Sequence, residues 1–291
     1  MKRATTPTPT KRFTVPAVDA GKELVAFLVE KTELSKTVMK KIIGQGGVWI
    51  QKPTEKKRRV KRVTTLIEEK DRIDFFYRPD LVILEDGCRP IFERHHFGFW
   101  IKQSGVPSEP TPFADKGSLL FEVQKKYPKA HLMGRLDLEV KGLVLVSYGP
   151  RAHRTLTQMP ETDCRKFYLA LVQGEVELIQ GEWTNDLDGK KAQTLYKVLA
   201  KDEGQTLVEV EIPSGRFHQI RRHFADNGHP LIGDPRYGED NKNGQRGLQL
   251  CCHRIEMKDP FDQRSKVVRH ELPLAEFPED LKIAFSRYKG L

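Results

Sequence analysis

Two residues suited to nucleophilic or acid–base chemistry, Arg135 and Asp137, stand two positions apart in the segment 134–142. A run of apolar residues at 143–146 follows and predicts a buried strand. We therefore expect the pair at the rim of a sheet. A nearby arginine favours the charged form of a carboxylate, which a nucleophile or general base requires. An ordinary surface salt bridge would explain the same pair, so this segment alone does not establish a function.

A second segment, 166–174, predicts a strand whose two faces differ in chemistry. Phe167 belongs to the apolar face, whereas Lys166 and Tyr168 belong to the other and would meet a cleft or solvent. An aromatic ring beside a cation can stack on a base that has left its helix. A tyrosine on a sheet face with no ligand is the alternative.

A third segment predicts a helix at 217–226, with Phe217 on its apolar stripe. Arg221 and His218 lie off that stripe on a polar face. Arg216 and Arg221, about one turn apart, would clamp phosphates or pair with a carboxylate. His218 and His223 have the wrong spacing for two metal ligands on one helical face.

The remaining motif search excludes several classes of protein. The sequence has no phosphate-binding glycine loop, no dinucleotide fingerprint and no zinc-protease motif, so we expect neither a cofactor nor a metal. The four cysteines form no C-x-x-C pair, which favours a reduced, cytoplasmic protein. No stretch approaches the ~18 apolar residues that span a bilayer, so we expect no membrane contact.

Short strands alternate irregularly with helices in the second part of the chain, which favours an α+β fold with a mixed, mainly antiparallel sheet. The predicted strands are 98–102, 142–147, 166–173, 207–212 and 249–255. The predicted helices between them are 119–127, 151–158 and 217–226.

The first part of the chain predicts a small separate domain at 17–78, with two short helices, a turn and a small sheet. Ser35 is the expected N-cap of the second helix, and the glycine-rich run 44–47 ends it before a strand at 48–50. The outer face of that helix carries three lysines, Lys36, Lys40 and Lys41. We further expect a disordered basic arm at 1–16, a linker at 79–95 and a catalytic domain at 96–291.

Positive charge is concentrated in the first quarter of the chain. Residues 1–80 contain 19 Lys and Arg against 10 Asp and Glu, so they hold +9 of the net charge of +10. Clustered positive charge is typical of proteins that bind phosphate backbones. We therefore expect a nucleic acid partner; a solvated surface or contact with anionic lipid is the alternative.

Taken together, the segments resemble the RluA family of pseudouridine synthases. That family shows His-Arg-Leu-Asp-x-x-Thr-Ser-Gly, Lys/Arg-x-Tyr, Gly-Arg-x-His-Gln-Ile-Arg and Gly-Asp-x-x-Tyr-Gly in this order. The matching segments here are 134–142, 166–168, 215–221 and 233–238. Residues 17–78 likewise resemble the small alpha-L (S4-like) RNA-binding domain. Gly134 stands in place of the family's histidine, and Val140-Lys141 in place of its Thr-Ser.

The resemblance implies isomerisation of uridine to pseudouridine in a structured RNA, ribosomal RNA first, by a monomer. Asp137 would attack the ribose or the base, and Arg221 would keep it ionised. Tyr168, the third catalytic residue, would stack on the uracil and help the later proton transfer. Arg135 would hold the flipped nucleotide or fill its gap. The other expected substrate-binding residues are Lys166, Arg216, His218, Gln219, Lys36, Lys40 and Lys41.

Three alternatives stay open at this point. A transfer RNA substrate fits the same motifs. A non-catalytic RNA-binding or assembly protein would explain the substitutions at Gly134 and 140–141. An unrelated hydrolase using Asp137 and His218 is disfavoured, because the sequence offers no oriented third group.

Overall fold

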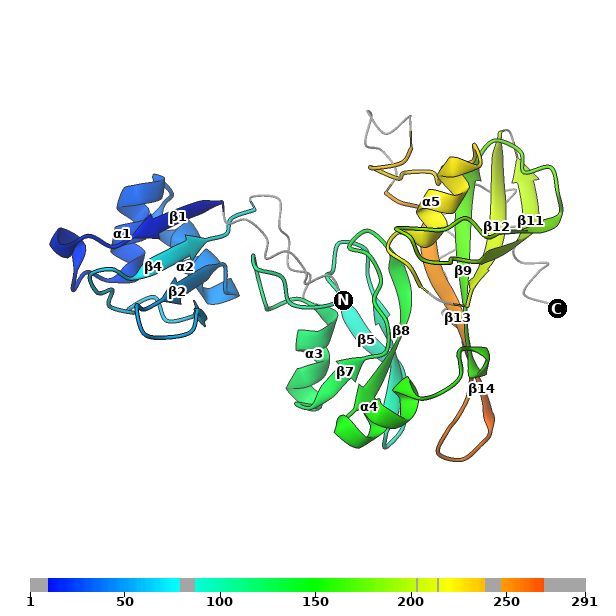
Figure 1. Cartoon of the computed structure of the whole chain (residues 1–291), viewed down its shortest axis with the longest axis horizontal. Coiled ribbons are helices and arrows are strands. Elements are labelled where there is room, and N and C mark those ends of the chain that lie inside the picture. Colours follow the sequence, from blue (N-terminus) through cyan, green and yellow to red (C-terminus); the bar gives the residue numbers. More distant parts are fainter. Residues whose placement is uncertain (1–9, 79–86, 203, 214, 239–246, 270–291) are drawn as a thin grey trace. The chain divides into compact units, whose positions relative to one another are not determined.

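A computed structural model describes residues 10–78, 87–202, 204–213, 215–238 and 247–269. These residues divide into two compact units, one formed by 1–85 with 109–122 and the other by 86–108 with 123–291 (Figure 1). Among the described residues, no helix has both the length and the apolar composition needed to cross a membrane.

The first unit packs two helices on a four-stranded antiparallel sheet of order β1-β4-β2-β3. Its elements are β1 (Lys11–Thr14), η1 (Ala17–Asp19), α1 (Leu24–Thr32), α2 (Lys36–Gln45), β2 (Val48–Gln51), β3 (Arg58–Val60) and β4 (Arg72–Phe75). Ser35 caps α2 as expected, because its hydroxyl accepts a hydrogen bond from the Val38 amide at 3.3 Å. Gly46, with φ of +92°, ends the helix in the left-handed region that favours glycine.

One face of α2 is buried and the other is open. Met39, Ile42 and Ile43 lie in the core of the first unit together with the apolar residues of α1 and the sheet. The three lysines of α2 (Lys36, Lys40 and Lys41) are all exposed. Helical periodicity therefore separates a packing face from a cationic face on this helix.

The predicted limits of the arm, the linker and the catalytic domain all differ from those of the structure. Within the expected arm 1–16, β1 pairs with β4; residues 1–9 lie outside the described residues. Within the expected linker 79–95, β5 (Cys88–Glu93) pairs with β6; residues 79–86 lie outside the described residues. Both strands are short edge strands, which carry little periodicity to detect in the sequence.

The segment 109–122 also departs from the expected division, because it belongs to the first unit. The Trp49 indole donates to the Pro112 carbonyl at 3.3 Å, and Arg59 donates to the Thr111 carbonyl at 2.9 Å. The Asp115 amide adds a 3.0 Å bond to the Gln45 carbonyl. These bonds join residues far apart in the sequence, so no local pattern announces them.

The second unit is built on a ten-stranded sheet of order β10-β11-β12-β9-β13-β8-β6-β5, with β14 beside β13 and β7 beside β8. Its strands are β5 (Cys88–Glu93), β6 (Phe97–Lys102), β7 (Ala130–Leu132), β8 (Lys141–Tyr148), β9 (Cys164–Gln173), β10 (Gln180–Trp183), β11 (Thr194–Asp202), β12 (Gln205–Ile212), β13 (Leu250–Lys258) and β14 (Ser265–Arg269). Its helices are α3 (Leu119–Lys126), which begins in the first unit, α4 (Pro150–Thr157), η2 (Glu161–Asp163) and α5 (Gln219–Asp226).

The predicted mixed, mainly antiparallel sheet is confirmed. Within the described sheet, β13 and β8 pair in parallel and the other neighbours pair antiparallel. The five expected strands are present with ends that shift by a few residues, whereas β10 and β11 were not predicted. Charged residues on one face of β10 and β11 interrupt the apolar run that identifies a buried strand.

Candidate active site

The three segments singled out in the sequence meet in the second unit. Asp137 lies on the loop between β7 and β8, Tyr168 on β9, and Arg221 on α5. Arg221 Nη1 donates to Asp137 Oδ2 at 3.2 Å, across 84 positions of sequence. The expected ion pair between Asp137 and Arg221 is therefore present.

The main partner of Arg221 is Asp234, which the sequence analysis had treated only as part of a turn. The Arg221 guanidinium donates two parallel hydrogen bonds to Asp234, at 2.7 and 2.8 Å. Both side chains are buried, 2% and 0% exposed. Burial alone would raise the pKa of Asp234, but the Arg221 bonds and backbone amides outweigh it and hold that pKa below its usual value. The Gly-Asp-x-x-Tyr-Gly motif at 233–238 was the sequence signal that could have identified this partner.

Asp137 lies at the solvent-exposed edge of the buried charge cluster that Arg221 and Asp234 form with it. Its side chain is 27% exposed, and its ion-pair contacts to Arg221 and His218 all use Oδ2. Oδ1 has no hydrogen-bond partner among the residues that the structure describes, so it is available to a ligand. An ionised carboxylate with one oxygen held and one open has the arrangement that a nucleophile or general base needs.

The backbone of the Asp137 loop is held by a neighbouring segment that begins at Lys102. The Ser108 hydroxyl donates to the Leu136 carbonyl at 2.6 Å and accepts from the Leu136 amide at 3.0 Å. On the other side of Asp137, the Leu138 carbonyl accepts from Lys102 Nζ at 3.3 Å and from the Gly105 amide at 2.8 Å. The residues before and after Asp137 are thus both fixed.

Lys102 is a buried cation that the sequence analysis did not assign to the site. Its Nζ donates to the carbonyls of Val106, Gln103 and Leu138 at 2.7, 3.1 and 3.3 Å. Burial lowers the pKa of Lys102 to about 8, although the charges of Asp137 and Glu139 oppose the shift. Lys102 therefore contributes both hydrogen bonds and positive charge to the back of the Asp137 loop.

Gly142, which closes the Asp137 loop, is required by the sheet. It pairs with Cys252 where β8 and β13 run in parallel, and its φ is +122°. A side chain at this position would place its Cβ 2.3 Å from the Cys252 carbonyl oxygen. Only glycine allows the loop to enter β8 at this close approach.

His218 lies against Asp137 at the start of α5. Its Nε2 is 3.5 Å from Asp137 Oδ2, and its Nδ1 is 3.1 Å from the Tyr237 hydroxyl. Burial, reinforced by the charge on Arg221, lowers the pKa of His218 despite the opposing charge on Asp137. The same Nε2 lies 3.4 Å from Arg221 Nη1, so the ring contacts both members of the ion pair.

Tyr168 is buried rather than offered to solvent, contrary to one of the two expectations. It is 7% exposed, and its hydroxyl lies beside Cys252. Burial, the Cys252 contact and the charge on Asp137 all raise the pKa of Tyr168 well above its usual value.

Lys166, on the same face of β9, approaches position 134 so closely that a Cβ there would lie 3.0 Å from its Nζ. Lys166 Nζ therefore lies beside the place that a side chain at position 134, where the family has histidine, would occupy.

Two expected substrate-binding residues have structural hydrogen bonds instead. Gln219 is 2% exposed, and its amide accepts from the Arg216 backbone and donates to Gln193 and Thr194. Its predicted contact with substrate is therefore wrong, because burial leaves it no open group. Arg216 Nε donates to the Lys191 carbonyl at 3.0 Å rather than pairing with a carboxylate. Arg135 is exposed on the loop that carries Asp137.

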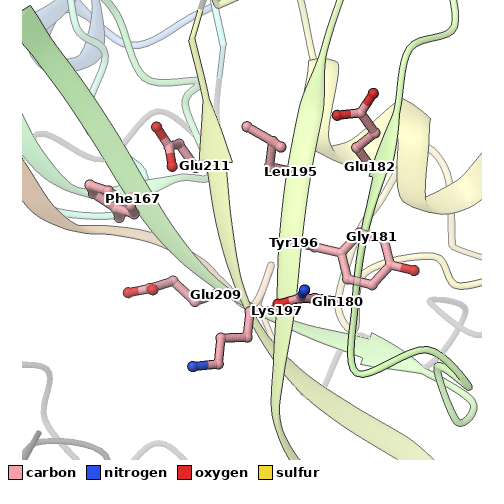
Figure 2. A pocket seen from close by; sticks show the side chains of 9 residues that line it. All are labelled: Phe167, Gln180, Gly181, Glu182, Leu195, Tyr196, Lys197, Glu209 and Glu211. Carbon is pink, nitrogen blue, oxygen red and sulfur yellow. The ribbon is translucent and has the colours of Figure 1, made fainter. Parts of the chain in front are cut away.

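A hollow of about 470 Å³ lies on the opposite face of the sheet (Figure 2). Phe167, Glu209, Glu211 and Leu195 line it, and strand alternation turns these residues away from the face that carries Tyr168. The Glu211 carboxylate is bound by Arg165 through two 2.7 Å bonds. The hollow is therefore separate from the Asp137 cluster.

Comparison with known proteins identifies the family. The family model for RNA pseudouridylate synthase matches residues 96–226. An uncharacterized RNA pseudouridine synthase of Aquifex aeolicus is 30% identical over 238 residues, 71% of this chain and 73% of the relative. The dual-specificity RNA pseudouridine synthase RluA of Yersinia pestis is 32% identical over 195 residues, 59% of this chain and 95% of the relative.

Solved structures show the same fold. The human RNA pseudouridylate synthase domain containing 1 aligns with a TM-score of 0.54 at 18% identity, covering 70% of this chain and 95% of that chain. The sequence matches extend over most of the two bacterial relatives, and the residues matched by the family model include Asp137, Tyr168 and Arg221. The chain therefore belongs to the RNA pseudouridylate synthase family, of the RluA type, whose reaction is the isomerisation of uridine in RNA.

Proposed function

We propose that this protein converts uridine to pseudouridine in ribosomal RNA, with Asp137 as the catalytic carboxylate. The observation that carries the assignment is the geometry of Asp137. One of its oxygens is held 3.2 Å from the buried Arg221, and its side chain remains 27% exposed at the mouth of the cluster. A non-catalytic RNA-binding protein would have no need of a buried cation that holds one oxygen of a carboxylate and leaves the other open.

Asp137 attacks either the anomeric carbon of the ribose or the uracil ring. The bond between N1 and the ribose breaks, the uracil turns, and C5 bonds to the ribose in its place. The bond that Asp137 formed to the substrate breaks as well, so the carboxylate is regenerated. The C5 proton leaves and N1 gains one, so the product is an isomer and no external reductant or nucleophile is consumed. Arg221 supports this step by holding Oδ2 of Asp137 through a charged hydrogen bond, and Asp234 holds Arg221 in place.

Tyr168 forms the floor of the uridine site. Its raised pKa keeps the phenol protonated at neutral pH, so it is not an ionised base in this reaction. Its ring is suited to stack on the flipped uracil, and Arg135, exposed on the same loop as Asp137, would hold the nucleotide or fill its gap. Lys166 and His218 lie on the same side of the sheet, where they can contact the nucleotide.

The first unit is proposed to be an S4-like RNA-binding domain that anchors the substrate. Its helices α1 and α2 pack on one small sheet, and α2 exposes Lys36, Lys40 and Lys41. All three lysines are open to solvent, so each can approach a phosphate. Such an anchor suits a large structured RNA and offsets the cost of flipping a base.

The cysteines bear on the proposed cellular setting. Among the described residues no disulfide joins Cys88, Cys164, Cys251 or Cys252, which supports a reducing compartment such as the cytoplasm. We propose that the protein acts there as a monomer without a cofactor. Transfer RNA is the second substrate class to be tested.

The deciding experiment maps pseudouridine at every position of ribosomal and transfer RNA, in cells with and without this protein. We expect sites in ribosomal RNA to disappear in the deletion and to return with the wild-type gene but not with Asp137→Asn. Loss confined to transfer RNA would replace the substrate assignment. An unchanged pseudouridine map would contradict the catalytic assignment itself.

The anchor is tested separately by charge reversal of Lys36, Lys40 and Lys41 together. Each lost phosphate contact should lower the slope of log affinity against log salt by about 0.9. Reversal of three other exposed lysines (Lys197, Lys201 and Lys258) is the matched control. Equal slopes for the two triple variants would exclude α2 as the anchor.

A further inference from the structure

Phe217 is exposed, although the sequence placed it on the apolar stripe of a helix. The helix α5 begins at Gln219, and Phe217 precedes it in a turn with 60% of its surface open. The predicted helix start at 217 is therefore wrong: His218, with φ of +53°, takes the backbone out of the helical path. An isolated exposed phenylalanine is ordinary on a protein surface, so its surroundings decide whether it has a role.

The ring of Phe217 is held directly beside the active site. It stacks on the His218 ring, with centroids 3.8 Å apart and planes at 18°. His218 in turn has its Nε2 3.5 Å from Asp137 Oδ2. Only the His218 ring therefore lies between Phe217 and the Asp137 carboxylate. The stacking on His218 also fixes the orientation of the Phe217 ring before RNA binds.

A cation accompanies this exposed ring. The Arg236 guanidinium lies 5.9 Å from the centroid of Phe217 and 5.5 Å from that of Tyr237. Arg236 is exposed and forms no ion pair with a carboxylate of the described residues. An open aromatic face beside an open guanidinium presents one surface for a base and one charge for a phosphate.

We propose that Phe217 stacks on the base of a nucleotide adjacent to the uridine at Asp137, while Arg236 contacts the phosphate of the same segment. This inference rests on the proposed function and deepens it, because it assigns a binding residue for the RNA that flanks the target. Flipping a uridine separates its neighbours from their stacking partner. Phe217 supplies a replacement surface, which lowers the cost of the flipped state.

The test combines a protein substitution with removal of a base. The probe is a short stem-loop RNA with uridines in its loop, in which each loop nucleotide in turn is made abasic. Wild-type protein, Phe217→Ala and Phe217→Trp are titrated with every probe by fluorescence anisotropy. Ile179→Ala, which shortens an apolar side chain that is 72% exposed, is the control for a general loss of apolar surface.

Loss of one stack should weaken binding of the intact probe to Phe217→Ala about tenfold. Phe217→Trp and Ile179→Ala should bind as the wild type does. At one loop position, removal of the base should weaken binding of the RNA to the wild type about tenfold as well. The same removal should leave the affinity of Phe217→Ala unchanged. That non-additivity identifies the stacked base.

Two results would overturn the inference. One is that Phe217→Ala binds the intact RNA as tightly as the wild type does, and the other is that both proteins lose equal RNA affinity at every abasic position. Binding requires no turnover, so the titration is informative whether or not a uridine is converted. Absence of pseudouridine formation by wild-type protein would instead overturn the proposed function.

Discussion

The two faces of the large sheet carry similar charge pairs in different surroundings. On one face Arg221 holds Asp234 through two hydrogen bonds, and both side chains are 2% exposed or less. On the opposite face Arg165 holds Glu211 through two bonds of 2.7 Å, but the side chains are 47% and 19% exposed. The bonding pattern is the same, so burial is the variable that differs.

Burial determines what each pair can do. Water screens Arg165 and Glu211, so the pair contributes little energy and either side chain can be solvated alone. Arg221 has no solvent to replace its partners, because it lies under Asp137 and beside Asp234. The buried pair therefore acts as a fixed positive charge for the exposed carboxylate, whereas the surface pair covers the ring of Phe167.

The largest expected effect is on turnover, from Asp137→Asn. This change removes the charge and the nucleophile, so the rate should fall by about a thousandfold or more. Stability should change by no more than about 1 kcal/mol, because Arg221 keeps both bonds to Asp234. Rate and urea unfolding are measured together. Asp188→Asn, at a carboxylate 69% exposed, is the control, and near-normal turnover in Asp137→Asn would refute its assignment.

Arg221→Ala should lower both stability and activity. Removing one partner of a buried pair leaves Asp234 with an unpaired charge, which costs about 3–5 kcal/mol. Asp137 loses its cation at the same time, so residual folded protein should also turn over slowly. Calorimetry and initial rates provide the measurements. The neighbour Arg222, paired with exposed Asp188, supplies the control Arg222→Ala. Equal free energies of unfolding for the two variants would mean that burial does not determine how much an ion pair contributes to stability.

Lys102→Met tests the other buried cation through pH. The pKa of Lys102 is lowered to about 8 from the ordinary 10.5, so between these values the unfolded chain binds a proton that the folded chain has released. The free energy of unfolding of the wild type should therefore rise with pH relative to Lys102→Met, by about 1.4 kcal/mol per pH unit within this window. Urea unfolding of both proteins across the window measures the difference. A constant difference would show that Lys102 titrates normally.

The smallest effect is expected on the opposite face, from Arg165→Ala. An exposed pair contributes about 0.2–1 kcal/mol, and the hollow beside it is separate from Asp137. Turnover should remain that of the wild type. A loss of stability comparable to that of Arg221→Ala would break the comparison between the two faces.

Much of the site was readable from the sequence because the reacting residues lie in short local motifs. Arg135-x-Asp137 comes just before a predicted strand, Lys166-x-Tyr168 lies within one, and Arg221 lies in a helix whose periodicity is visible. The cap at Ser35 and the left-handed glycine at Gly46 were equally local. Such features depend on neighbours within a few positions, so the sequence by itself determined them.

Other features depended on contacts between distant segments. Asp234 became the principal partner of Arg221, and Lys102 came to hold the Asp137 loop, through bonds that no spacing rule predicts. The same holds for buried Tyr168 and Gln219, and for Phe217, which a turn of the backbone exposed. Burial, partner choice and pKa are set by all the chain that surrounds a group, which is why only the tertiary structure decided them.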